Sequence, residues 1–189
     1  MSTTPDPMKS KISLHGLGFI QVQLEGNQRL HVWHPDLPRR KCFEHSAIHD
    51  HRFSFRSQVL VGAMVNQAYA VAGNRPTPHG RYMTYLHEGP RTANGGRPWT
   101  PDGRIDLVTA NVAEIRAGGS YVMPNYIFHQ TVPLGDGRVA TLMTKLDEGD
   151  AGAHSTCSFG VEPDTDFDRF QVSDEDLWKV VAEVLGGVS

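Results

Sequence analysis

The sequence contains only two cysteines, Cys42 and Cys157, among its 189 residues. Two cysteines without a repeated spacing are too few for a disulfide framework, so we expect a reducing compartment. Long apolar runs are also missing, because no stretch approaches the roughly 18 apolar residues of a membrane span. Residues 1–10 have no apolar signal core. These absences predict a cytoplasmic protein without a membrane partner.

Clustered positive charge is equally scarce. The 18 Lys and Arg residues are spread along a chain of formal net charge −3, and Arg39-Arg40-Lys41 is the only basic triplet. We interpret this triplet as a solvated loop, with anion binding as the alternative. A nucleic-acid partner is therefore not expected. The length and the 39% hydrophobic content fit one domain that buries its own core.

Short alternating segments separated by turn residues predict an all-β fold. The run 19–24 alternates apolar and polar residues, and Gly26-Asn27 separates it from 30–33, so a hairpin is expected. The stretch 48–71 is long enough for one bent strand or two, with Gly62 as the bend. A further strand at 81–87 should pair back onto this stretch. The remaining strands are predicted at 105–116, 120–123, 128–132 and 139–146. A total of about eight or nine suits a sandwich or a small barrel.

Two other segments have a distinct composition. Residues 88–104 are rich in Gly and Pro, which predicts a long irregular loop that is either a lid over a site or a surface insertion. Near the C-terminus, Ser173 is a suitable N-cap and three acidic residues follow it. An apolar stripe then runs to Gly186. We expect a helix at about 174–185 that packs on a sheet or on another subunit.

Three histidines are the best candidates for chemistry. His49 and His51 are two residues apart, so on a strand both imidazoles leave the same face. His129 follows a Gly, a strand-like run and a Pro. Neutral imidazole suits Zn, Fe, Cu and Ni, whereas Mg and Ca prefer oxygen ligands. The pattern predicts a mononuclear metal site with open positions. The alternative is that some of these are ordinary histidines, since the chain has ten.

The residues around these histidines resemble the two motifs of the cupin superfamily. In the first motif a His-x-His pair is followed by a Glu and then a Gly, and this chain has His49, His51, Phe55 and Gly62 at the matching steps. The second motif runs from a Gly through a Pro and a second Gly to a His. Here Gly118, Pro124, Tyr126 and His129 occupy these positions. The Glu and the second Gly are therefore replaced.

The resemblance implies a cupin-type double-stranded β-helix, a jelly-roll sandwich or small barrel, over about residues 18–147. Residues 1–17 would then be an N-terminal extension, and 148–189 a C-terminal extension that carries the α-helix. Without the Glu, the metal set His49, His51 and His129 is similar to the three-histidine branch to which thiol dioxygenases belong. The family also implies a homodimer.

Strand alternation predicts the walls of the pocket. If His49 and His51 face the interior, then Phe53, Phe55 and Ser57 share that face while Arg52, Ser54 and Arg56 point away. A bulge would instead bring Arg56 beside the metal, where it could clamp a carboxylate. By analogy with the site tyrosine of thiol dioxygenases, the candidates for a donating phenol include Tyr121 and Tyr126. Packing is the alternative role for both tyrosines.

Three hypotheses for function follow. The first is an Fe(II) dioxygenase that acts on a small cytosolic molecule. The second is a redox-neutral isomerase, lyase or hydrolase that uses Zn, Ni or Mn as a Lewis acid. The third is a non-catalytic cupin that binds a small ligand. A pocket without a carboxylate favours the first, because proton transfer needs a positioned acid or base.

Overall fold

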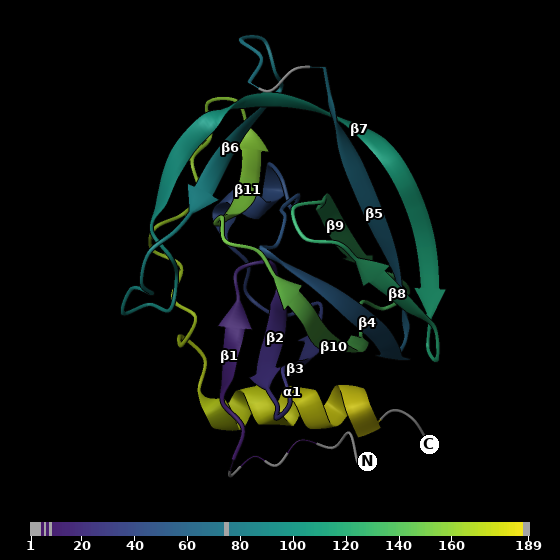
Figure 1. Ribbon diagram of the computed structural model, residues 1–189. Coiled ribbons are helices and arrows are strands. Elements are labelled where there is room, and N and C mark those ends of the chain that lie inside the picture. The colour runs from purple at the N-terminus through teal and green to yellow at the C-terminus, as the bar shows by residue number, and fades with distance from the viewer. Residues whose placement is uncertain (1–4, 6, 8, 74–75, 187–189) are drawn as a thin grey trace.

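The computed structural model describes residues 5, 7, 9–73 and 76–186, which form two antiparallel sheets and one α-helix (Figure 1). The first sheet contains, in spatial order, β1 (Ile12–His15), β2 (Phe19–Gln23), β3 (Gln28–Trp33), β10 (Val139–Glu148), β4 (Phe53–Val61) and β8 (Ser120–Met123). The second contains β11 (Ala153–Ser158), β6 (Tyr82–His87), β7 (Trp99–Arg116), β5 (Ala63–Ala72) and β9 (Phe128–Pro133). A short 3-10 helix, η1 (Lys41–Glu44), and the C-terminal helix, α1 (Asp174–Gly186), complete the fold.

The second sheet curls until its two edges meet at residue 49. His49 forms isolated antiparallel bridges with His129 on β9 and with Ser155 on β11. The His49 amide donates to the His129 carbonyl at 3.0 Å, and the His129 amide donates back to the His49 carbonyl at 2.9 Å. On the other edge, the Thr156 amide donates to the Ile48 carbonyl at 3.0 Å. The long arch of β7 in Figure 1 spans the opposite side of this closed arrangement.

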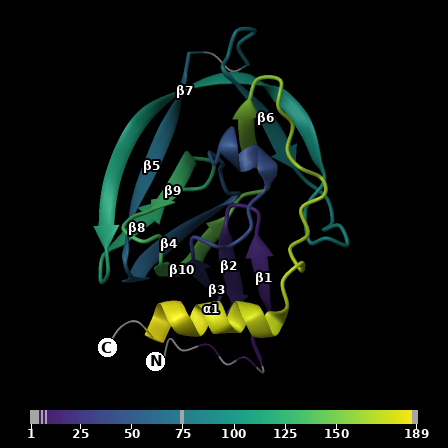
Figure 2. The same ribbon diagram turned by 180° about the vertical axis from the view of Figure 1, so that it is seen from behind.

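The first sheet is covered on both faces. On β3, the side chains of Leu30 and Val32 are fully buried beneath α1, whereas Arg29, His31 and Trp33 line a cavity between the sheets. This alternation is the expected result of a strand placing successive side chains on opposite faces. Figure 2 shows α1 lying across this sheet. Its buried apolar residues are Leu177, Val181 and Val184. Each contributes about 1.5–3 kcal/mol through burial.

The predicted fold class is confirmed: the protein is predominantly β, with curled antiparallel sheets and one C-terminal helix. The helix begins where Ser173 predicts, because the Ser173 hydroxyl accepts a hydrogen bond from the Asp176 amide at 3.2 Å. The bend at Gly62 is also observed, between β4 and β5. In addition, β1 and β11 join the sheets, although the sequence pattern did not predict either strand.

The predicted pairing of one strand and the predicted extent of one loop are wrong. Strand β6 pairs with β7 and β11 and not with the preceding β5. The predicted loop 88–104 ends at residue 98, because β7 begins at Trp99 and includes Pro101 and Gly103. A register shift between Met83 and Tyr85 accommodates these breakers opposite β6. Proline and glycine therefore mark an irregularity within a strand here, where the composition suggested a loop.

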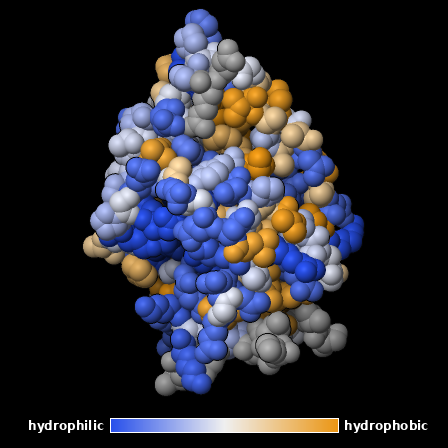
Figure 3. Space-filling model, in the orientation of Figure 1, coloured by the Kyte–Doolittle hydropathy of each residue, from blue (hydrophilic) through white to orange (hydrophobic). Residues whose placement is uncertain are grey.

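The surface mixes polar and apolar side chains (Figure 3). Hydrophobic residues are exposed on β7, where Val108 and Val112 lie on the outside of the second sheet. In the described part of the chain, no helix combines the length and the apolar character needed to cross a membrane.

The turn at Gly62 should be intolerant of a side chain. Its φ is +74°, and an added Cβ would lie 2.5 Å from the Arg138 carbonyl oxygen. We expect Gly62→Ala to lower the free energy of unfolding by about 2–4 kcal/mol, since backbone strain and a steric clash add together. The matched control is Gly26→Ala, because Gly26 has φ +65° but nothing within 4 Å of an added Cβ. Its loss should be about 1 kcal/mol. Equal losses in urea denaturation would contradict the steric explanation.

Candidate metal centre

The fold brings His49, His51 and His129 together. One ligand nitrogen from each lies within 4.8 Å of the others. The backbone explains this placement, because His49 and His129 are directly opposite each other in the antiparallel bridge and His51 follows on the same face. Imidazole nitrogens bind first-row ions at about 2 Å, so side-chain rotation is enough to place all three on one ion. The structure therefore brings together the three predicted ligands.

Backbone carbonyls fix the orientation of two of the rings. Nδ1 of His49 donates to the Ala47 carbonyl at 2.9 Å, and Nδ1 of His129 donates to the Ile127 carbonyl at 3.2 Å. A carbonyl oxygen can only accept, so the proton must reside on Nδ1. The lone pair of Nε2 is then free in both residues. This arrangement is typical of metal-binding histidines, where the second nitrogen holds the tautomer.

Burial keeps all three imidazoles neutral. It lowers the pKa of His129 to about 3, and it is also the main cause of the lowered pKa of His49 and of His51. Repulsion among the three rings lowers the pKa of His51 and His129 further. A metal ion binds the deprotonated imidazole. At neutral pH these side chains are therefore ready to bind a cation without first losing a proton.

Aromatic rings form one wall of the site. The ring of Phe55 lies 5.3 Å from that of His51 and 5.9 Å from that of His129, and Phe53 lies 4.9 Å from His51. Phe53, Phe55 and Ser57 all line the same cavity as the histidines. Phe55 therefore packs directly against two of the three candidate ligands. The donor set is three nitrogens beside an apolar surface, which suits a transition metal and disfavours Mg²⁺ or Ca²⁺.

The histidines open into a cavity of about 480 Å³ between the two sheets. Several of its polar lining residues were missed by the sequence analysis, namely His15, His31, His87, Arg29, Arg91, Arg97 and Arg169. Strand alternation carries a signal for two of them. Arg29 and His31 alternate with the apolar Leu30 and Val32, which indicates a polar inner face on this strand.

Two polar atoms in the cavity wall have no hydrogen-bond partner in the described part of the chain. They are Nε2 of His31 and Oγ1 of Thr141. The two residues are directly opposite each other on β3 and β10. Burial lowers the pKa of His31 to about 3, so its ring is neutral. A buried polar group without a partner is costly, so this pair is suited to contact a bound ligand or water.

The additional site candidates lie in different places. Tyr121 lines the cavity together with Ser57 and Thr131. Arg56 is exposed and donates to Ser120 at 3.3 Å, because β4 continues without a bulge at that point. Its proposed position beside the metal is therefore wrong. Arg52 does reach the cavity, contrary to the alternation, because β4 begins only at Phe53.

Tyr126 has a structural role outside the cavity lining. Its φ is +59°, a conformation that glycine adopts most easily. The hydroxyl of Tyr126 accepts from the Ala151 amide at 3.0 Å, so the larger side chain is anchored to the turn after β10.

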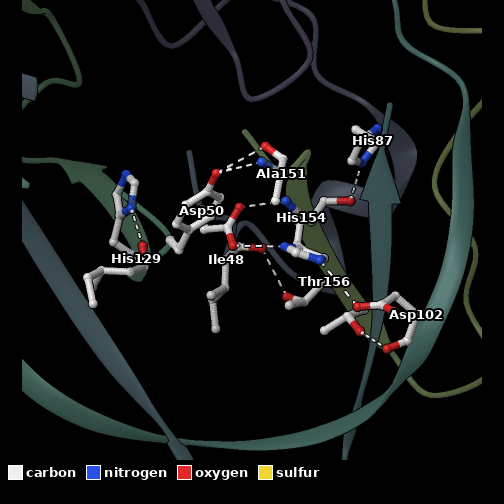
Figure 4. A network of polar contacts seen from close by, with 12 residues as sticks. Ile48, Asp50, His87, Asp102, His129, Ala151, His154 and Thr156 are labelled. Carbon is white, nitrogen blue, oxygen red and sulfur yellow. Dashed lines mark hydrogen bonds and ion pairs between the residues drawn. The ribbon is translucent and has the colours of Figure 1, made fainter. Parts of the chain in front are cut away.

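A charged network supports the segment that carries His49 and His51. Asp50 lies between them and points to the opposite side, where its carboxylate is 2.9 Å from Nδ1 of His154 (Figure 4). The other ring nitrogen of His154 lies 3.2 Å from Asp102. Asp50 is only 3% exposed. Because this network ties residue 50 to β11 and β7, it holds the two flanking histidines in position.

Comparisons with known proteins give little further information. No family matches the sequence, and no curated protein is similar to it. A solved structure of oxalate oxidase is similar over 99% of this chain and 76% of that chain, with a TM-score of 0.33 and 13% sequence identity. A similarity this low assigns neither a family nor an activity, so the function must be argued from the site.

Removal of a ligand should abolish metal binding. We expect His49→Ala and His129→Ala to lose stoichiometric metal while they keep a β-rich fold, because the bridge between these residues uses only backbone atoms. The matched control is His79→Ala, since His79 is exposed and outside the cluster. Elemental mass spectrometry and far-UV circular dichroism measure the two properties. Unchanged metal content in both variants would disprove the three-histidine site.

A carboxylate at residue 55 should strengthen the site. Phe55→Glu places an anionic oxygen beside His51 and His129, so we expect divalent ions to be retained at least about tenfold more tightly, or ~1.4 kcal/mol. Phe55→Gln is the control of equal size without the charge. Retention can be followed by competition with a chelator. If Phe55→Glu holds metal no better than Phe55→Gln, residue 55 does not face the ion.

Proposed function

We propose that the protein is a mononuclear metal-dependent enzyme of the cupin type, an Fe(II) dioxygenase that acts on a small anionic molecule. The observation that carries this proposal is a cluster of three neutral imidazoles with no carboxylate among them. Such ligands leave the full charge of a divalent ion uncompensated, so an anionic substrate is attracted to it. A bound ferrous ion would supply the electrons and the open coordination positions that oxygen chemistry requires.

The acids around the cavity argue against proton transfer as the main chemistry. They are Glu88, Glu148 and Asp150. Glu148 is held by Arg52 at 2.6 Å and by Lys145 at 2.7 Å. Glu88 and Asp150 are exposed. A general base needs to reach the reacting atom, and none of these carboxylates belongs to the histidine cluster. This favours an oxidative reaction over a redox-neutral one.

The remaining residues near the cluster would shape the reaction. Phe53 and Phe55 exclude water from one side of the histidines. Burial raises the pKa of Tyr121, so its phenol stays protonated and can serve as a hydrogen-bond donor within the cavity. His31 and Thr141 offer polar atoms that would otherwise have no partner. In this proposal these groups orient the substrate while the three histidines hold the ion.

Oxygen consumption tests the proposal. After anaerobic reconstitution with Fe(II), we expect one iron per chain and O₂ uptake that depends on a small thiol or carboxylate from a panel. The His129→Ala variant and the zinc-loaded protein are the controls, and neither should consume O₂. If the protein retains zinc or nickel tightly and shows no substrate-dependent uptake, the dioxygenase proposal fails. Redox-neutral catalysis or ligand binding would then explain the site.

A further inference from the structure

Five arginines surround the cavity beyond the histidine cluster. Arg29, Arg91, Arg97 and Arg169 line the cavity that contains the histidines. A second cavity of about 500 Å³ shares His49, His51 and three of these arginines with the first, and it adds Arg40. We call these five residues the arginine cluster. They come from β3, from the segment before η1, from the loop 88–98 and from the segment before α1, so distant parts of the chain converge here.

The charges of the arginine cluster are not neutralised by direct ion pairs. No ion pair connects any of the five arginines to an acid among residues 9–73 and 76–186. Three of these arginines donate hydrogen bonds to backbone carbonyls instead. Arg91 donates to Gly95, Arg97 donates to Gly89, and Arg169 donates to Leu14. The Nε atom of Arg40 is buried and has no hydrogen-bond partner in the described structure.

The arginines are also close enough to repel one another. Burial, and then repulsion from Arg91, Arg29 and Arg40, lowers the pKa of Arg169 to about 10. Arg169 is only 9% exposed. Burial, followed by repulsion from Arg91, lowers the pKa of Arg29 as well, and attraction to the Glu148 carboxylate opposes this shift. Arg91 and Arg97 are exposed, so the repulsion is most unfavourable at the buried Arg169. A bound anion would relieve it.

Two glycines make room for this arrangement. A Cβ at Gly16 would lie 2.6 Å from Cδ of Arg40, and a Cβ at Gly95 would lie 3.0 Å from Cδ of Arg169. The absence of a side chain at these two glycines therefore leaves space for Arg40 and Arg169 beside the cavity. Guanidinium groups offer a planar fork of donors that matches carboxylate and phosphate oxygens.

We infer that the arginine cluster binds a second anionic group of the substrate, a carboxylate or a phosphate, while the first anionic group reaches the metal. This inference rests on the proposed function for the metal-bound end alone. It narrows the substrate class to small molecules with two anionic groups at opposite ends.

Titration calorimetry with inorganic phosphate tests the cluster without metal. In the metal-free protein we expect phosphate to bind, and Arg29→Gln and Arg91→Gln to weaken it by at least about tenfold. Arg52→Gln is the matched control, because Arg52 lines the same cavity but is paired with Glu148. Its effect should be less than about twofold. Arg169 is left intact because it holds the Leu14 carbonyl at 2.8 Å.

Succinate and its monoamide, succinamate, test the two-ended arrangement in the zinc-loaded protein. Succinate should bind at least about tenfold more tightly, and removal of zinc or Arg91→Gln should abolish the preference. Two results would overturn the inference but leave the metal site in place. One is equal affinity of the zinc-loaded wild type for succinate and succinamate. The other is phosphate affinity that does not change in Arg29→Gln and Arg91→Gln. If zinc does not bind at the histidines but phosphate binding still depends on these arginines, the proposed function fails and the anion site stands.

Discussion

The structure depends on one antiparallel backbone pair, His49 with His129. Its two hydrogen bonds join the edge strand β9 to residue 49, and the Ser155 bridge on the other side closes the second sheet. The same pair sets the direction of both imidazoles, because residues opposite each other in such a bridge place their side chains on the same face. Closing the sheet and assembling the candidate ligands are therefore one structural event. The same backbone pairing that closes the sheet thus also places the candidate ligands beside one another.

The first sheet contributes the rest of the site because both of its faces are used. Leu30 and Val32 pack beneath α1, and this burial secures the strand whose other face presents Arg29 and His31 to the cavity. Without α1, the apolar side chains of Leu30 and Val32 would be exposed to solvent. Here the helix takes the apolar face, so polar residues can line the interior without loss of the core. The C-terminal helix thus supports the site although it lies on the far side of the sheet.

Local sequence patterns predicted much of this structure, and the predictions that failed did so for physical reasons. The hairpin, the bend at Gly62, the helix and the three histidines all follow from periodicity or motif spacing, which are properties of neighbouring residues. The pairing of β6 depends on which distant strand lies beside it, and this information is not in the local pattern. The arginine cluster was missed for the same reason. Its members are scattered along the chain and converge only when the sheets and loops are packed.

The charged side chains that line the cavity are mainly positive. Phe55 packs against His51 and His129, and no carboxylate belongs to the histidine cluster. The nearest acid network, Asp50 with His154 and Asp102, points away from the histidines, and Glu148 is paired with Arg52 and Lys145. The same cavity is lined by arginines that form no ion pair with an acid in the described part of the chain. With a divalent ion held by neutral ligands, this cavity would carry an excess of positive charge, and the buried Arg169 would be its least solvated part. If an anionic ligand neutralises this charge, as we propose, selectivity for anions is a property of the whole cavity and not of the metal ligands alone.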